Sequence, residues 1–224
     1  MKYRHEIKHC INMSDYYSIT SRLKHIIVRD SNVGDSGEYK IRSIYFDNLY
    51  DKALIEKQLG INNRDKFRIR YYNDDLNLIK LEKKSKRNGL CLKVSAPISK
   101  EECEKLLNGD IAFLRDSSKK LFNELYVKMK IQLLKPKTIV DYTREPYIYK
   151  AGNVRITFDK KIRTGIWNTD FLNSEIVTKP IISNDYMVLE VKWDEYLPEI
   201  IQDCVQQGRL SSSVSKYALC RMYD

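Results

Sequence analysis

Short strand-like runs that carry charge at every second position most constrain how this chain can fold. The alternating sets are Arg4, Glu6 and Lys8; Lys66, Arg68, Arg70 and Tyr72; Lys80, Glu82 and Lys84; Arg155, Thr157 and Asp159; and Glu190 with Lys192. Successive side chains of a strand point to opposite faces, so each run has one ionic face and one apolar face. If the ionic faces converge, the protein encloses a basic, carboxylate-dotted cavity that suits a polyanion.

The alternative for any single run is an ordinary half-exposed strand whose charged face is solvated. Two features of the set favour the cavity. Arginine, which is frequent in the runs, presents a fork of donors that grips phosphate oxygens. Isolated acids among the bases provide the arrangement needed to hold a divalent cation beside phosphates: Glu6, Glu82, Asp159 and Glu190. A general nucleic-acid surface would rarely carry these acids, and no direct nucleic-acid role is expected.

Composition limits the class of protein without choosing the ligand. The chain has 224 residues, of which 42% are hydrophobic, enough for a core in one domain spanning residues 1–224. Lys and Arg number 40 against 30 for Asp and Glu, giving a net charge of +10. This surplus implies an anionic partner: nucleic acid, a phosphorylated small molecule or a membrane surface.

Five cysteines argue for a reducing compartment, because their number is odd and no pair has CxxC spacing. They are Cys10, Cys91, Cys103, Cys204 and Cys220. The pattern supports neither a disulfide framework nor a zinc site, and it predicts mostly buried, reduced thiols in a cytoplasmic protein. No segment resembles a signal peptide or reaches the ~20 apolar residues of a membrane span, so we expect no transmembrane segment. The sequence also lacks a GxxxxGK[ST] or GxGxxG phosphate loop.

Periodicity predicts an α+β fold with about eight strands and several helices. The expected strands are residues 2–11, 39–47, 65–73, 77–84, 88–96, 138–149, 153–159 and 186–194. The first expected helix begins near Ser14. The other expected helices cover residues 51–58, 99–109, 117–135, 198–207 and 211–223. An antiparallel sheet closed into a barrel, with helices packed outside, would bury the apolar faces and bring the ionic faces together.

Local signals set some of these boundaries. Ser14 is a plausible N-cap for the first helix, whose apolar stripe extends to Ile27. Ser99 and Glu102 form a capping box, and Gly109 ends that helix. Asn73-Asp74-Asp75 predicts a hairpin turn. Residues 160–185 are compatible with either a lid or a loop.

Several short motifs follow one another in a recognisable order along nearly the whole chain. They are RHEIK from Arg4, SIYFD from Ser43, KFRIRYY from Lys66, LEKK from Leu81, VDYTR from Val140, VRITFD from Val154, LEVK from Leu189 and SKY from Ser215. Each motif is weak alone, but together they are specific. The chain resembles the catalytic domain of the vacuolar transporter chaperone (VTC) family of polyphosphate polymerases, which belong to the triphosphate tunnel metalloenzymes.

This resemblance implies an eight-stranded antiparallel β tunnel and assigns its wall. The expected grip on the triphosphate and the growing chain comes from Lys8, Arg68, Arg70, Lys84, Arg144 and Arg155. Further phosphate contacts are expected from Lys93, Tyr142, Lys192, Ser215 and Lys216. The resemblance makes Glu190 the main metal ligand, with Glu6 as a helper, for Mn²⁺ or Mg²⁺. It implies ATP and polyphosphate as ligands and leaves room for a membrane-protein partner that exports the polymer.

One departure from the wider tunnel superfamily bears on the reaction. Its triphosphatases open with ExExK, whereas this chain has Arg4 at the first acidic position, which removes a metal ligand and adds a phosphate ligand. The expected function is therefore a metal-dependent polyphosphate polymerase that transfers the γ-phosphate of ATP. The alternatives are a triphosphatase on the same scaffold, in which water replaces the acceptor, and a non-catalytic polyanion-binding module.

Overall fold

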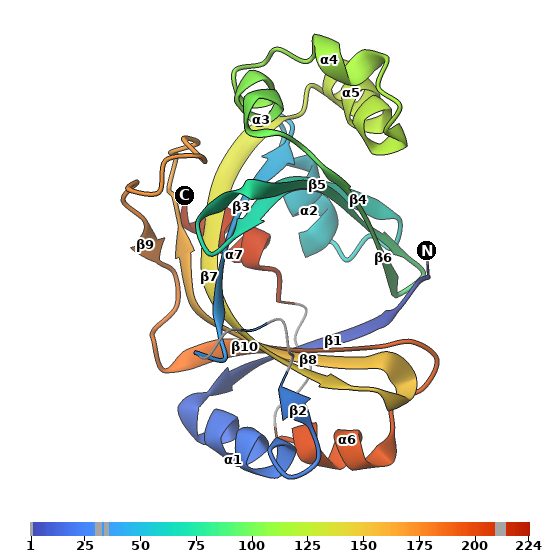
Figure 1. Ribbon diagram of the computed structural model, residues 1–224, viewed down its shortest axis with the longest axis vertical. Helices are drawn as coiled ribbons and strands as arrows, with labels where there is room; N and C mark the ends of the chain where they lie inside the picture. Colours follow the sequence, from blue (N-terminus) through green and yellow to red (C-terminus); the bar gives the residue numbers. More distant parts are fainter. Residues whose placement is uncertain (1, 30–32, 34–35, 209–213) are drawn as a thin grey trace.

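A computed structural model of the chain describes residues 2–29, 33, 36–208 and 214–224, and Figure 1 shows their arrangement. The long strands are β1 His5–Asn12, β3 Tyr39–Asp47, β4 Arg64–Tyr72, β5 Asp75–Arg87, β6 Leu90–Pro97, β7 Lys135–Tyr149, β8 Val154–Thr164 and β10 Tyr186–Trp193. Two short strands, β2 Val28–Arg29 and β9 Lys179–Pro180, pair with β7 and β8. The helices are α1 Met13–Leu23, α2 Lys52–Gln58, α3 Lys100–Leu107, α4 Ala112–Arg115, α5 Lys120–Gln132, α6 Glu199–Val205 and α7 Lys216–Tyr223.

The long strands form one antiparallel sheet in the order β1-β10-β8-β7-β3-β4-β5-β6, and this sheet curls on itself (Figure 1). Its edge strands, β1 and β6, meet through a single bridge in which Arg4 and Cys91 exchange two backbone hydrogen bonds of 2.9 Å. The expected α+β class and antiparallel sheet are confirmed, but the prediction of a closed barrel is wrong. Beyond the bridge, charged side chains span the gap, as where Lys84 of β5 reaches Glu6 of β1 at 2.6 and 2.8 Å.

Apolar side chains on the convex face of the sheet explain where most helices lie. Phe67 and Ile69 of β4 pack with Leu121 and Leu125 of α5 in one buried cluster. A second cluster joins β8 and β10 to α1 and α6. Burial of these faces is the main favourable term in folding, and it leaves the ionic faces on the inside of the curl. The alternation in the sequence therefore separates a core outside the sheet from a charged interior.

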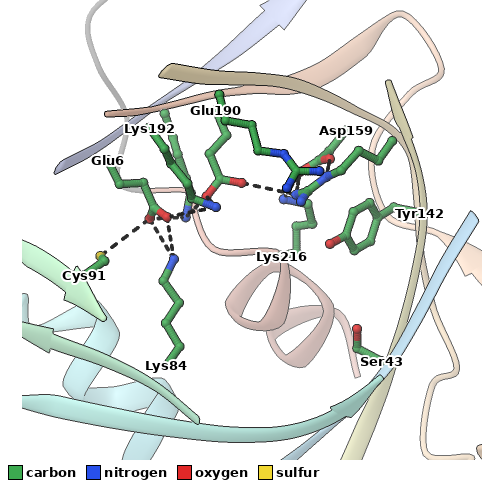
Figure 2. A network of polar contacts seen from close by, with 12 residues as sticks. Glu6, Ser43, Lys84, Cys91, Tyr142, Asp159, Glu190, Lys192 and Lys216 are labelled. Atoms are coloured by element: carbon green, nitrogen blue, oxygen red, sulfur yellow. Dashed lines mark hydrogen bonds and ion pairs between the residues drawn. The ribbon is translucent and has the colours of Figure 1, made fainter. Parts of the chain in front are cut away.

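Helix α7 packs on the concave face of the sheet, where Ala53 of α2 joins the same buried cluster (Figures 1 and 2). Its Tyr217 and Cys220 are buried with Ile41 of β3 and Tyr142 of β7 in a third cluster. A helix was predicted over residues 211–223, and the observed helix begins only at Lys216. Ser211 lies outside the described residues. This placement brings Ser215 and Lys216 into the interior of the curl.

The structure confirms the predicted cap of α3 and the turn between β4 and β5, but not the predicted cap of α1. Asn12, rather than Ser14, caps α1 through a capping box with Asp15, so the predicted N-cap is wrong by two residues. Ser99 and Glu102 form the predicted capping box of α3. Asn73 and Asp74 adopt φ of 50° and 58°, as a tight hairpin turn between β4 and β5 requires.

Outside the named strands, residues 160–185 form mostly loop and turn: β8 continues to Thr164 and only β9 follows before β10. Within the described ranges, no helix is long and apolar enough to cross a membrane. None of the five cysteines, all of which lie in the described ranges, forms a disulfide, and Cys103, Cys204 and Cys220 are buried.

Candidate phosphate-binding cavity

The concave face of the sheet encloses a cavity of about 440 Å³. Every residue that the family resemblance assigns to the site lines it: Glu6, Lys8, Arg68, Arg70, Lys84, Lys93, Tyr142, Arg144, Arg155, Glu190, Lys192, Ser215 and Lys216. These residues come from most of the long strands and from α7, so the fold brings together positions far apart in the sequence. The structure thus shows that these residues lie together around one cavity, and the role of each stays a prediction.

Two carboxylates, Glu6 of β1 and Glu190 of β10, project from neighbouring strands of one wall of this cavity, with lysine ammonium groups between them (Figure 2). Lys8 Nζ lies 2.9 Å from Glu6 Oε1 and 3.6 Å from Glu190 Oε1. Lys192 Nζ lies 3.0 Å from Glu190 Oε1 and 3.5 Å from Glu6 Oε2. Lys84 adds two short contacts to Glu6. The pairing of β1 with β10, which sets Lys8 opposite Glu190 and Glu6 opposite Lys192, produces this arrangement.

The charges of this group are stable near neutral pH. Burial opposes ionisation of Glu6, but the ammonium of Lys8, with those of Lys84 and Lys192, outweighs it and lowers the pKa of this carboxyl to about 2. Glu190 is buried, and Lys192 and Lys8 hold its pKa well below the usual range. The same carboxylates raise the pKa of Lys8 against the effect of its own burial. Two anionic oxygen donors therefore face the cavity.

Arg144 is held from behind by a buried acid. Its guanidinium donates to both oxygens of Asp159, at 2.7 and 2.8 Å, and also to Glu190 Oε2 at 3.2 Å. Lys216 forms a second ion pair with Asp159, whose side chain is completely buried. Because Asp159 faces these two cations, it fixes both of them relative to the cavity.

A second buried acid holds the opposite wall. Arg68 donates to Glu82 Oε2 from Nε and Nη2, at 2.8 and 2.6 Å, and Lys93 reaches Glu82 Oε1 at 3.0 Å. The neighbouring Arg70 is positioned by neutral groups: it donates to Ser43 Oγ at 2.8 Å and to the hydroxyl of Tyr142 at 2.9 Å. These arginines are therefore oriented before any ligand binds.

A family model for the VTC domain matches residues 3–223, which is nearly the whole chain. The chain belongs to the VTC domain family. The match confirms the resemblance drawn from the motifs, and it covers every residue of the cavity wall described above. No curated protein matches the chain.

Solved structures similar to this VTC domain are distant in sequence. The PH1012 protein of Pyrococcus horikoshii is 13% identical, with a TM-score of 0.48, over 96% of this chain and 98% of that one. The PH1819 protein of the same organism is 14% identical, with a TM-score of 0.43, over 91% of this chain and 84% of that one.

The acids of this VTC domain divide into two groups, which corrects one expectation. Glu82 and Asp159 were predicted among the acids that hold a cation, but neither lines the cavity, and each is paired with an arginine and a lysine of the wall. They position arginines instead. In the part of the chain that the structure describes, no group of three or more His, Cys, Asp or Glu could hold a metal ion.

The carboxylates that remain, Glu6 and Glu190, fit a hard divalent cation that takes its other ligands from elsewhere. Mg²⁺ is commonly bound through one or two carboxylates, with water and substrate phosphates completing the coordination. Oxygen donors of this kind also suit Mn²⁺. The donor set therefore matches a cation that arrives with a phosphorylated ligand better than one caged by the protein alone.

Several lining residues of the VTC domain were not assigned from the sequence. A basic group at one end contains Lys57, Arg64, Lys66 and Lys86, and tyrosines elsewhere include Tyr39, Tyr45 and Tyr72. Lys66 belongs to the alternating run of β4, and Arg64 and Lys86 extend the alternation of β4 and β5, so that signal could have identified them. Lys57 lies on α2, and no local pattern predicts its approach to the cavity.

Proposed function

We propose that this VTC domain is a polyphosphate polymerase that transfers the γ-phosphoryl group of ATP to the end of a polyphosphate chain, with Mn²⁺ or Mg²⁺ as cofactor. The observation that carries the proposal is the Glu6–Glu190 carboxylate pair inside a cavity whose other charged lining residues, among those the structure describes, are all basic. Excess cations suit several consecutive phosphates, and the carboxylate pair suits a divalent ion beside them.

The arginines bind and orient the phosphates. Phosphoryl transfer depends mainly on in-line positioning and on stabilising the charge of the transferred group. Arg68, Arg70 and Arg144 are suited to this because Glu82, Ser43 and Asp159 already fix their guanidinium groups. Donors fixed in advance need little reorganisation during the reaction. Arg155, whose Nη2 lies 3.2 Å from the hydroxyl of Tyr39, would extend the same wall.

A divalent cation held by Glu190, with Glu6 as second carboxylate, would neutralise phosphate oxygens and hold them in place. Lys8 and Lys192 occupy the space between these carboxylates and would turn toward phosphate oxygens. The terminal phosphate of the acceptor is anionic near neutral pH, so the transfer requires no protein group to remove a proton. Arg4, which binds Asp194 at 2.8 Å and lines the cavity, supplies a further cation at the position where related triphosphatases carry an acid.

The test is to incubate the full chain with ATP and Mn²⁺, separate the products on a gel stained for polyphosphate, and measure ADP. A polymer ladder with matching ADP release supports the polymerase. Phosphate release without polymer would replace it with the triphosphatase. Binding of polyphosphate without either product, and without dependence on metal, would leave the polyanion-binding module. Export through a membrane-protein partner stays a prediction that this assay does not address.

A further inference from the structure

A second hollow, smaller than the phosphate-binding cavity, opens between α2 and α5 (Figure 1). Its volume is about 140 Å³. Its floor is apolar and consists of Phe46, Phe67 and Leu134, which belong to the buried cluster beneath α5. Its sides carry charged groups of α2, β4 and α5, among them Glu56, Arg64 and Lys128. The proposed phosphoryl transfer gives this hollow no role.

Each of the two helices presents an exposed apolar stripe beside the hollow. On α2 the stripe is Ile55 with Leu59 at the C-cap, and Leu59 is 72% exposed. On α5 it is Val127 and Ile131, and Ile131 is 75% exposed. Residues three or four apart are neighbours on a helix surface. The residues three positions before Ile55, Leu59 and Ile131 all line the hollow, so the stripes form its two rims.

The acids of the hollow are already engaged within the protein. Glu56 Oε1 lies 3.7 Å from Lys52 Nζ, and Asp65 Oδ1 lies 2.8 Å from Arg87 Nη2. Asp47, which is completely buried, accepts two backbone N–H groups of α2. These carboxylates are therefore balanced by groups of this chain.

The other bases of the hollow have no such partner. Across the described residues, no ion pair joins a carboxylate to Arg64, Lys128 or Lys135. Arg64 donates instead to the backbone carbonyl of Ile61. The side chains of Arg64 and Lys128 are half-buried, and Lys135, which directly follows Leu134 of the floor, is exposed. A hollow with apolar rims and a surplus of positive charge is complementary to a partner that brings apolar side chains together with carboxylates.

We propose that the hollow between α2 and α5 is a docking groove for an acidic amphipathic helix of a partner protein. Such a helix would insert one apolar side chain into the hollow, pack the next ones on the two rims and place carboxylates beside Arg64 and Lys128. The 13 residues of α5 extend over about 20 Å, which matches a partner helix of about four turns.

Other occupants fit the groove less well. A self-complementary contact between two copies of this chain would set the unpaired bases of one copy against those of the other. A bilayer presents a broad surface that cannot fill a hollow between two helices, whereas a single side chain of a helix can.

Arg64 connects the groove with the phosphate-binding cavity, because its side chain lines both hollows. Helix α2 likewise presents Lys57 to the cavity and Leu59 to the surface beside the groove. A docked helix would therefore lie next to one end of the cavity. The docking itself does not depend on which reaction the cavity performs.

The test is selection of helices from a display library, with the full chain as bait. The library consists of amphipathic helices of about four turns, in which the apolar stripe is Leu, Ile or Phe and the polar positions vary among Glu, Lys, Gln and Ser. Fluorescence anisotropy then measures the binding of enriched peptides to wild type, to Leu59→Gln/Ile131→Gln and to Lys128→Gln. The matched control is Tyr17→Gln/Ile200→Gln, which removes two exposed apolar side chains of α1 and α6.

We expect the enriched peptides to carry an excess of Glu. They should bind Leu59→Gln/Ile131→Gln at least about tenfold more weakly than wild type, because both rims lose an apolar contact. Lys128→Gln should weaken binding about two- to fivefold, and the control should bind as wild type does. Equal binding by wild type and the rim variant would place the peptides elsewhere, such as in the basic cavity, and would overturn the proposal. Enrichment of basic or uncharged helices, or no enrichment, would overturn it as well.

Two further measurements test the other occupants directly. Light scattering follows the mass of the wild-type chain, and sedimentation follows its binding to vesicles of phosphatidylglycerol and phosphatidylcholine. A dimer that Leu59→Gln/Ile131→Gln disrupts would assign the groove to a second copy. Vesicle binding that the same variant loses would assign it to a membrane surface. Either result would replace the partner helix, and we expect the rim variant to change neither measurement.

Discussion

Tyr217 of α7 donates its phenolic hydrogen to the carboxylate of Asp47, at the end of β3. The same carboxylate accepts the backbone N–H groups of Asn48, Ala53 and Leu54, at 2.9, 2.9 and 3.2 Å, and so caps the start of α2. Burial and the nearby charge of Asp47 raise the pKa of Tyr217 far above its ordinary value, so this hydroxyl stays a donor. One buried acid thus joins β3, α2 and the helix that carries Ser215 and Lys216.

Tyr217→Phe should therefore weaken the attachment of α7 to β3 and α2 without creating a cavity in the core. The ring remains, but Asp47 loses one donor, and we expect stability to fall by about 1–2 kcal/mol. For a domain of this size the Tm would drop by roughly 2–4 °C per kcal/mol. Tripolyphosphate affinity should fall as well, because Ser215 and Lys216 immediately precede Tyr217. Differential scanning calorimetry and phosphate titration measure both effects. Tyr223→Phe, an exposed tyrosine of the same helix, is the control and should leave both unchanged.

Asp159→Asn should be more damaging, although this residue does not line the cavity. The amide keeps the shape but leaves Arg144 and Lys216 buried with less compensating charge, and removing one partner of a buried pair typically costs about 3–5 kcal/mol. We expect a clear loss in chemical denaturation and weaker phosphate binding by the protein that remains folded. Glu195→Gln, which removes an exposed acid paired with the exposed Lys2, should change stability by less than about 0.5 kcal/mol. Equal stability of the two variants would contradict the positioning role.

The alternation of charge predicted the faces of the strands because a period of two follows directly from strand geometry. Residues 39–47 were predicted as a strand and form β3 with those bounds. Closure could not be predicted in the same way, since it depends on strand tilt and stagger around the whole sheet. Among the described residues, the backbones of the two edges pair at one bridge, between Arg4 and Cys91. The local sequences of β1 and β6 do not predict how far the two strands pair.

The site was predictable as a set of residues but not as a set of contacts. Glu82 and Glu190 look alike in the sequence, each an acid beside alternating bases. The register of β4 on β5 sets Glu82 opposite Arg68, whereas that of β1 on β10 sets Glu190 opposite Lys8. Only these long-range pairings distinguish an acid that is buried behind the wall from one that lines the cavity. Lys57 shows the same limit, because α2 reaches the cavity through tertiary packing alone.

Glu190→Gln separates the metal role from phosphate binding. Loss of the carboxylate charge should reduce metal-dependent turnover of ATP by about 100-fold or more, corresponding to roughly 3 kcal/mol of transition-state stabilisation. Tripolyphosphate should bind in the absence of metal at least as tightly as to wild type, because a negative charge has been removed from beside Lys8, Lys192 and Arg144. Turnover and metal-free titration are compared with those of Glu175→Gln, an exposed acid away from the cavity. Full metal-dependent turnover by Glu190→Gln would refute the assignment.

Lys66→Met should stabilise the ligand-free protein in a pH-dependent way. The folded-state pKa of Lys66 is about 7, below the value of about 10.4 for an unfolded lysine, so keeping this amine charged costs stability at low pH. The cost is fully present below about pH 7 and fades as the pH rises toward 10, because the folded protein then carries the amine neutral. We expect the variant to gain roughly 2–4 °C in Tm per kcal/mol recovered at pH 6, and to gain less at pH 9. Thermal unfolding at both pH values measures the difference, with Lys105→Met as the exposed control. A variant less stable than wild type at pH 6 would mean that Lys66 stabilises the fold and is not held there at a cost for binding an anion.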